Sequence, residues 1–162
     1  MALSRTELVK KISDAFADAS YPGDDRVAYD QSGRHLECDQ VARHFRGKHW
    51  QSLSVQYLRQ QPEAMFFFSP EGLAFFLPAY LLASVNDYKR ADSIPLGVIV
   101  SLSPSLSKTP MGDFKKGIDG LSTAQRQAIA SFLEYLKDTH GGDFPLGEPQ
   151  TALDEFWARY LP

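Results

Sequence analysis

The chain concentrates its apolar residues in one stretch, Met65-Phe-Phe-Phe-Ser-Pro-Glu-Gly-Leu-Ala-Phe-Phe-Leu-Pro-Ala-Tyr-Leu-Leu-Ala-Ser84. Ser69 is a favourable N-cap, Pro70 suits the first helical position, and Glu71 places a negative charge in the first turn. Apolar side chains then occupy every face, so the helix is expected to be buried all round. Pro78 lacks the N–H that continues a helix, which predicts a kink or a break just before it. We therefore expect a buried central helix around which the other segments pack.

Length and composition indicate one globular domain over residues 1–162. Hydrophobic residues make up 43% of the chain and charged residues 23%, which is ordinary for a folded domain. A chain of this length buries enough surface to fold without disulfides or metals. The formal net charge of −3 provides no electrostatic footprint for nucleic acid or for an anionic membrane surface. Those two classes of partner are not expected.

The sequence also predicts a cytoplasmic location. The single cysteine, Cys38, has no second cysteine with which to form an internal disulfide. The first residues lack the basic start and apolar run of a signal peptide. The uncharged run over residues 72–86 is shorter than the roughly 20 residues that a membrane-spanning helix needs.

Caps and apolar spacing predict further helices on both sides of the central one. Ser4-Arg-Thr-Glu7 is a capping box that opens a helix ending by Ser20. Another capping box at Ser122 opens the clearest helix of the second half. The remaining expected helices cover residues 36–46, 54–60 and, capped by Thr151, 152–160. The predicted fold class is all-α, a single compact domain of about six helices around a buried, proline-kinked central helix, with at most a minor strand element.

Two segments are harder to assign. In residues 94–102, Val98-Ile-Val100 favours a strand, whereas Pro95 and the helical spacing of the leucines favour a short helix, which we prefer. Residues 103–120 are rich in Pro, Ser, Gly and Lys, and we expect them to cross the surface as a long loop, either mobile or functional.

The residues that could act as metal ligands or as a nucleophile are concentrated in His35-x-x-Cys38 and His44-x-x-x-x-His49. On a helix, His35 and Cys38 would share a face as a zinc pair requires, but His44 would lie roughly 180° away. A zinc ion would therefore need a further ligand from another part of the chain. A thiolate–histidine nucleophile would need the fold to bring Cys38 close to a histidine. The sequence contains no phosphate-binding loop, nucleophile elbow, dinucleotide fingerprint or zinc-protease motif. We assign no catalytic, cofactor-binding or metal site.

Acidic and aromatic residues offer weaker signals. The carboxylates of Asp24-Asp25 and of Glu37 with Asp39 are interpreted as solvated caps. Phe, Tyr and Trp account for 20 of 162 residues, and aromatic residues dominate both cores and binding hot spots. Six in the central stretch, including Phe66, are expected in the core. Five lie in polar company and are candidate anchors for a partner, although core packing is the preferred role for each: Trp50, Tyr57, Tyr88, Trp157 and Tyr160.

The central stretch also resembles the signature of a bacterial family of uncharacterised small proteins. The matching residues are Phe67-Phe-Ser-Pro-Glu71 and Phe75-Phe-Leu-Pro-Ala-Tyr-Leu-Leu-Ala83, preceded by Trp50 and Leu58 and followed by Thr123-x-Gln-x-x-Ala-Ile-x-x-Phe-Leu133. The likeness covers roughly residues 50–136. It implies a bacterial origin and a cytosolic location, and it implies no activity, substrate or catalytic residue.

Two hypotheses about function remain open. The leading one is a non-enzymatic protein-binding module, with an immunity-type inhibitor of a bacterial toxin as one form. Its partner is another protein, and residues 24–34 and 103–120 are candidate contact surfaces. The alternative is a small enzyme or metal-dependent protein that uses Cys38 with His35 or His44.

Overall fold

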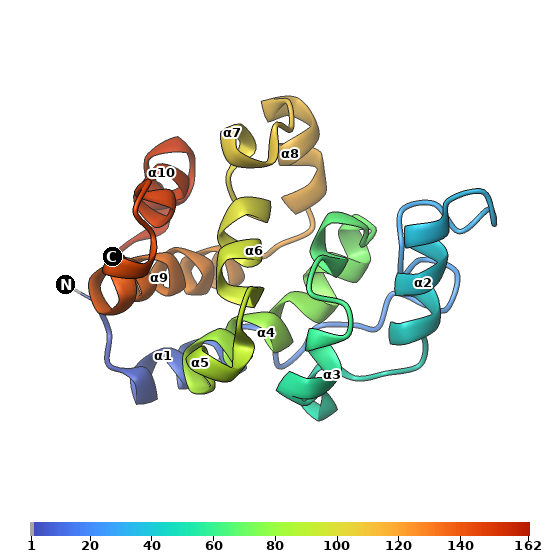
Figure 1. Cartoon of the computed structure of the whole chain (residues 1–162), viewed down its shortest axis with the longest axis horizontal. Helices are drawn as coiled ribbons and strands as arrows, with labels where there is room; N and C mark the ends of the chain where they lie inside the picture. The colour runs from blue at the N-terminus through green and yellow to red at the C-terminus, as the bar shows by residue number, and fades with distance from the viewer. Residues whose placement is uncertain (1) are drawn as a thin grey trace.

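Helices account for all the regular structure of residues 2–162. The computed structural model describes residues 2–162, which form ten α-helices, four short 3-10 helices and no strand (Figure 1). An isolated antiparallel bridge joins Ala28 to Phe68. The α-helices are α1 (Arg5–Ala15), α2 (Leu36–Phe45), α3 (Val55–Arg59), α4 (Pro70–Asn86), α5 (Tyr88–Ala91), α6 (Ile94–Ser101), α7 (Pro104–Ser107), α8 (Met111–Ile118), α9 (Thr123–His140) and α10 (Glu148–Glu155). The 3-10 helices are η1 (Trp50–Ser52), η2 (Ala64–Phe66), η3 (Gly141–Asp143) and η4 (Trp157–Tyr160).

Helix α4 is the central helix that the apolar stretch predicts. The side chain of Ser69 accepts a hydrogen bond from the Gly72 amide, and Pro70 begins the helix as expected. Eleven of its seventeen residues are buried. The helix continues through Pro78 to Asn86, so the predicted break is wrong, whereas a kink at this position stays a prediction.

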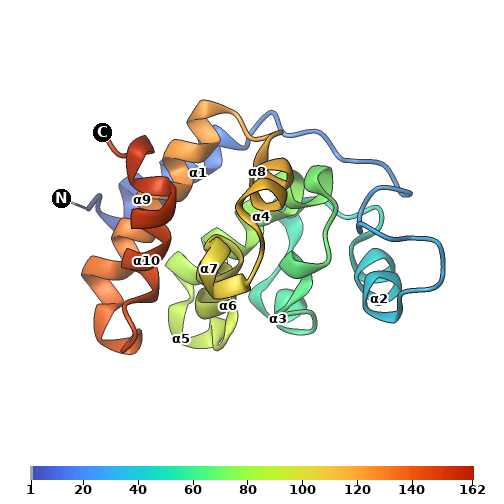
Figure 2. The ribbon, with the colours of Figure 1, turned by 90° about the horizontal axis from the view of Figure 1, so that it is seen from above.

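The other helices lie around α4 and extend to either side of it. Helices α1, α3, α5, α6 and α8 all contact α4. Figures 1 and 2 show α9 and α10 at one end of the molecule, where both termini also lie, and α2 at the opposite end. Both predicted capping boxes are present, Ser4 with Glu7 in α1 and Ser122 with Gln125 in α9. One connected apolar cluster runs through these helices.

The structure decides the two segments that are harder to assign from the sequence. Residues 94–101 form helix α6, so the preferred helix is confirmed and the strand alternative is wrong. Residues 103–120 are not a loop, because they contain α7 and α8, with Phe114 and Ile118 buried. Serine and proline serve there as cap and first-turn residues: Ser103 caps α7, whose first residue is Pro104. Together with α5, which the sequence also did not predict, these short helices bring the number in residues 2–162 to ten, against about six predicted.

The last helix begins earlier and ends sooner than predicted. Helix α10 starts at Glu148 after Gly147, whose φ of 69° only glycine adopts readily. Thr151 is therefore inside the helix, and its hydroxyl donates to the Gly147 carbonyl instead of capping the helix start. A separate 3-10 turn, η4, follows and contains Trp157.

None of the helices in residues 2–162 is long and apolar enough to cross a membrane.

Candidate functional site

The polar segment between α1 and α2, residues 23–35, is fixed to the start of α4. The Tyr29 amide donates to the Phe67 carbonyl at 3.0 Å, and the Ser69 amide donates to the Val27 carbonyl at 3.0 Å. Within the segment, Gln31 Oε1 accepts hydrogen bonds from the backbone amides of Val27 and Ala28 at 2.7 and 2.9 Å. Backbone pairing therefore holds in place a segment that has no helix of its own.

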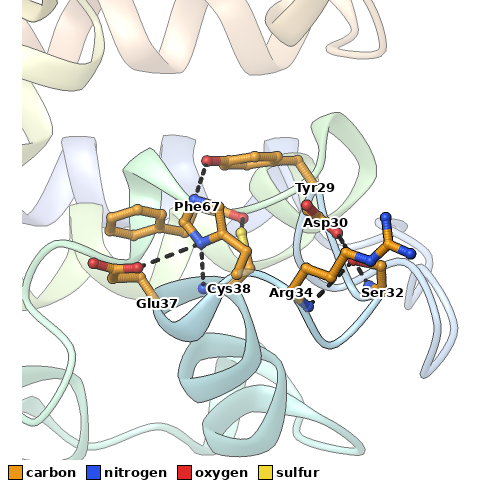
Figure 3. A network of polar contacts seen from close by, with 8 residues as sticks. Tyr29, Asp30, Ser32, Arg34, Glu37, Cys38 and Phe67 are labelled. Atoms are coloured by element: carbon orange, nitrogen blue, oxygen red, sulfur yellow. Dashed lines mark hydrogen bonds and ion pairs between the residues drawn. The ribbon is translucent and has the colours of Figure 1, made fainter.

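Two rings of this segment, Tyr29 and His35, lie against the ring of Phe67, and we call these three rings the ring cluster. Figure 3 labels Tyr29 and Phe67. The Tyr29 and Phe67 rings stack with centroids 6.5 Å apart, and His35 lies 5.3 Å from Tyr29 and 5.8 Å from Phe67. The Tyr29 hydroxyl lies 2.8 Å from His35 Nε2. Tyr29 is nevertheless 54% exposed. Because its ring and hydroxyl are held by Phe67 and His35, the ring cluster is an ordered aromatic surface.

His35 joins the ring cluster to helix α2. It is not within the helix, as the His35–Cys38 spacing suggested, but is its N-cap in an extended conformation. Its Nδ1 accepts a hydrogen bond from the Cys38 amide at 3.3 Å. Because Nδ1 is the acceptor, the proton of the neutral ring resides on Nε2 and is donated to the Tyr29 hydroxyl. The same ring therefore caps the helix and orients Tyr29.

Cys38 lies beneath the cluster, fully buried. Its thiol points to the Phe67 carbonyl at 3.9 Å, which is a weak contact. Burial raises the pKa of the Cys38 thiol, and polar groups of Asp30 and Tyr29 offset this only in part. His35 Nδ1 faces the Cys38 amide, not its sulfur. A nucleophile or metal ligand needs an accessible thiolate, and this arrangement favours a buried thiol.

The other two histidines near Cys38 in the sequence take part in separate interactions. The His44 ring stacks on Tyr57 at 3.9 Å, and its Nε2 lies 2.9 Å from the Tyr57 carbonyl oxygen. Burial lowers the pKa of His44. His49 caps η1 by accepting from the Gln51 amide. In residues 2–162, no group of three His, Cys, Asp or Glu side chains is placed to hold a metal ion.

Carboxylates border the ring cluster. Asp30 accepts hydrogen bonds from the Ser32 hydroxyl and amide, which lower its pKa. Glu37 Oε2 lies 3.5 Å from His35 Nδ1. Of the first predicted pair, Asp24 accepts a hydrogen bond from the Tyr21 hydroxyl at 2.6 Å. These carboxylates therefore make local contacts within the segment and at the start of α2.

The large exposed apolar residues lie outside the five aromatic candidates, for which core packing is the preferred role. Trp50 and Trp157 are buried, at 3% and 0% exposure. The large exposed side chains instead include Leu36 at 64%, Tyr29 at 54% and Phe66 at 39%, although Phe66 was expected in the core. Tyr29 is not among the residues that the sequence singles out. The signal that could have indicated it is an aromatic side chain within the otherwise polar residues 24–34, a candidate contact surface.

These features describe a small all-helical protein that presents an ordered aromatic surface, with its thiol buried and its histidines engaged as caps and stacking partners. A family model described as a family of unknown function, DUF6714, matches residues 4–161, and the chain belongs to this family. No curated protein and no solved structure matches the chain. Family membership agrees with the resemblance to an uncharacterised family, while the bacterial origin stays a prediction.

Proposed function

We propose that this protein is a non-enzymatic protein-binding module that contacts its partner through the ring cluster and the adjacent Leu36. The observation that carries the proposal is the fixed position of an exposed tyrosine: Tyr29 is 54% exposed, yet its hydroxyl is bonded to His35 and its backbone to Phe67. Tyrosine is enriched in binding hot spots. A side chain that is already ordered loses less conformational entropy on binding, which favours affinity.

The charge around the ring cluster favours a basic partner. Residues 29–39 carry three carboxylates, Asp30, Glu37 and Asp39, and one guanidinium, Arg34. Carboxylates at the rim of an interface accelerate the encounter with a positively charged protein more than they strengthen the final complex. An immunity-type inhibitor that neutralises a basic bacterial toxin by direct contact is one form that such a module takes.

A pull-down from the source organism tests this proposal. The tagged full chain is expected to recover a stoichiometric partner, and the variants Tyr29→Ala and Leu36→Asp are expected to lose it. Leu146→Asp is the matched control, because Leu146 is 82% exposed and precedes α10, away from the ring cluster. It should recover the same partner as the natural chain.

Two outcomes would contradict the proposal. Repeated failure to recover a partner, together with turnover of a small molecule by the purified chain, would argue for an enzyme. Equal loss of a recovered partner in the Leu36→Asp and Leu146→Asp variants would place the contact surface elsewhere or indicate a general loss of solubility.

A further inference from the structure

A second surface feature, away from the ring cluster, is a cavity beside the central helix. It has a volume of about 490 Å³ and is formed by residues of α1, η1, α3, α4 and α5. These helices lie together along the lower edge of Figure 1. The lining combines apolar and charged side chains, among them Trp50, Leu53, Leu82, Asp87 and Arg90.

The indole of Trp50 is the unusual group in this lining. The residue is only 3% exposed, and its Nε1 has no hydrogen-bond partner among residues 2–162. The other tryptophan shows the ordinary arrangement, because Trp157 Nε1 donates to the Leu102 carbonyl at 2.8 Å. A buried N–H without an acceptor destabilises a fold, so nearly all such groups in proteins have one. Trp50, which lines the cavity, thus has a buried N–H donor that lacks an acceptor.

The cavity also contains two opposite charges that are only loosely paired. Arg90 Nη1 and Asp87 Oδ1 are 3.7 Å apart, beyond hydrogen-bond distance, and both side chains are partly exposed. A guanidinium has five N–H donors in a planar fork that matches a carboxylate. Each of these charges can therefore bind a ligand group of opposite sign.

We propose that this cavity binds a small zwitterion of the amino-acid class. The ligand carboxylate pairs with Arg90 and supplies the acceptor for Trp50 Nε1, and the ammonium group pairs with Asp87. Leu53 and Leu82 provide apolar contact for the ligand side chain. This site does not include the ring cluster. Ligand binding in the cavity is therefore independent of protein binding at the ring cluster.

Access to Trp50 Nε1 requires a small rearrangement, because the atom is sealed from solvent. Gln51 and Gln56 are both exposed and both line the cavity. Long exposed side chains change rotamer within nanoseconds, and we expect such a movement of cavity side chains to accompany the approach of a ligand oxygen to the indole.

Nuclear magnetic resonance of the two indole N–H groups tests the proposal directly. The ¹⁵N-labelled chain has two tryptophans, Trp50 and Trp157, and a Trp50→Phe variant assigns their signals. The twenty L-amino acids are titrated to millimolar concentration. At least one with an apolar side chain, such as leucine, is expected to shift the Trp50 signal and leave the Trp157 signal in place. Absence of a shift with every amino acid would overturn the proposal.

Two leucine analogues and two variants then test the assigned contacts. Isoamylamine lacks the carboxylate of leucine and 4-methylpentanoate lacks the ammonium group, and each is expected to bind at least about tenfold more weakly than leucine. Arg90→Gln is expected to weaken leucine binding by about the same factor. The matched control is Arg59→Gln, because Arg59 is a half-exposed arginine that pairs with Asp92 outside the cavity. Equal binding of the analogues and leucine, or an unchanged affinity in Arg90→Gln, would contradict the assignment.

Discussion

The backbone carbonyl oxygen of Val27 occupies the space where a Cβ atom would stand at Gly72. Gly72 is the third residue of α4, and the same carbonyl accepts the hydrogen bond from the Ser69 amide. Residues 23–35 therefore pack backbone against backbone on the first turn of the central helix. This close approach holds the ring cluster at the surface, because Tyr29 follows Val27 by two residues.

Gly72→Ala is expected to destabilise the protein. Its methyl group would overlap the Val27 carbonyl, and a backbone atom yields less readily than a side chain. The free energy of unfolding, measured with urea, should fall by about 1–3 kcal/mol. The control is Gly117→Ala in α8, where a Cβ meets no atom within 4 Å and alanine should stabilise the helix by up to about 1 kcal/mol. A Gly72→Ala variant as stable as the natural chain would refute the close approach.

The two roles of His35 can be separated by substitution. His35→Ala removes the cap of α2 and the partner of Tyr29, and should lower the free energy of unfolding by about 1 kcal/mol. His35→Asn keeps a good capping group, so its stability should remain near that of the natural chain. Asparagine does not supply the Nε2–H that orients Tyr29.

Binding of the partner should therefore decrease in both His35 variants, although only His35→Ala is less stable. Chemical unfolding gives the stability, and binding to the partner recovered in the pull-down gives the affinity. Full affinity in His35→Asn would show that Tyr29 needs no orientation by His35.

The buried thiol leads to a prediction about reactivity. Burial removes Cys38 from solvent and raises its pKa, so the thiolate fraction at neutral pH is small. A thiol-specific reagent should label the native chain much more slowly than the urea-unfolded chain. Cys38→Ala should bind the partner normally, and a chelator should leave the melting temperature of untagged protein unchanged. Rapid native labelling, or a chelator-induced loss of stability, would instead support the alternative that uses Cys38 with His35 or His44.

Local patterns in the sequence predict the helix starts well. Ser69 with Pro70 and the capping box at Ser122 each define a helix start from adjacent residues, and the structure confirms both. Composition wrongly predicted a loop over residues 103–120, because proline and serine are common at helix starts as well as in loops. The burial of Phe114, which stabilises α8, depends on distant helices.

The candidate site was harder to predict, because its key relationships join distant residues. His35 and Cys38 are close in sequence, and their spacing suggested a shared helix face, whereas His35 is the N-cap and contacts the Cys38 amide. Tyr29 meets Phe67 across 38 positions, and nothing in either local sequence predicts that pairing. The requirement for glycine at position 72 likewise comes from a distant residue, because the Val27 carbonyl packs against it.

Glu155 provides the clearest expected dependence of stability on pH. Its Oε1 accepts a hydrogen bond from the Ser103 hydroxyl at 2.9 Å, and its Oε2 accepts one from the Ser105 amide at 3.1 Å. Burial alone would raise the pKa of Glu155, but hydrogen bonds from Ser105 and Ser103 outweigh it and lower the pKa below its ordinary value of 4.5. The carboxylate thus joins α10 to the start of α7.

A lowered pKa in the folded state means that ionised Glu155 stabilises the fold above pH 4.5, and that this stabilisation is lost as the pH falls through the folded-state value. Glu155→Gln should lower the free energy of unfolding by about 1–2 kcal/mol at pH 7. The difference from the natural chain should shrink as the pH is lowered below 4.5, which urea unfolding at a series of pH values measures. Glu63→Gln is the control, because Glu63 is exposed and its side chain caps no helix in residues 2–162. A difference between Glu155→Gln and the natural chain that stays constant down to pH 3 would show that the carboxylate acts by shape and not by charge.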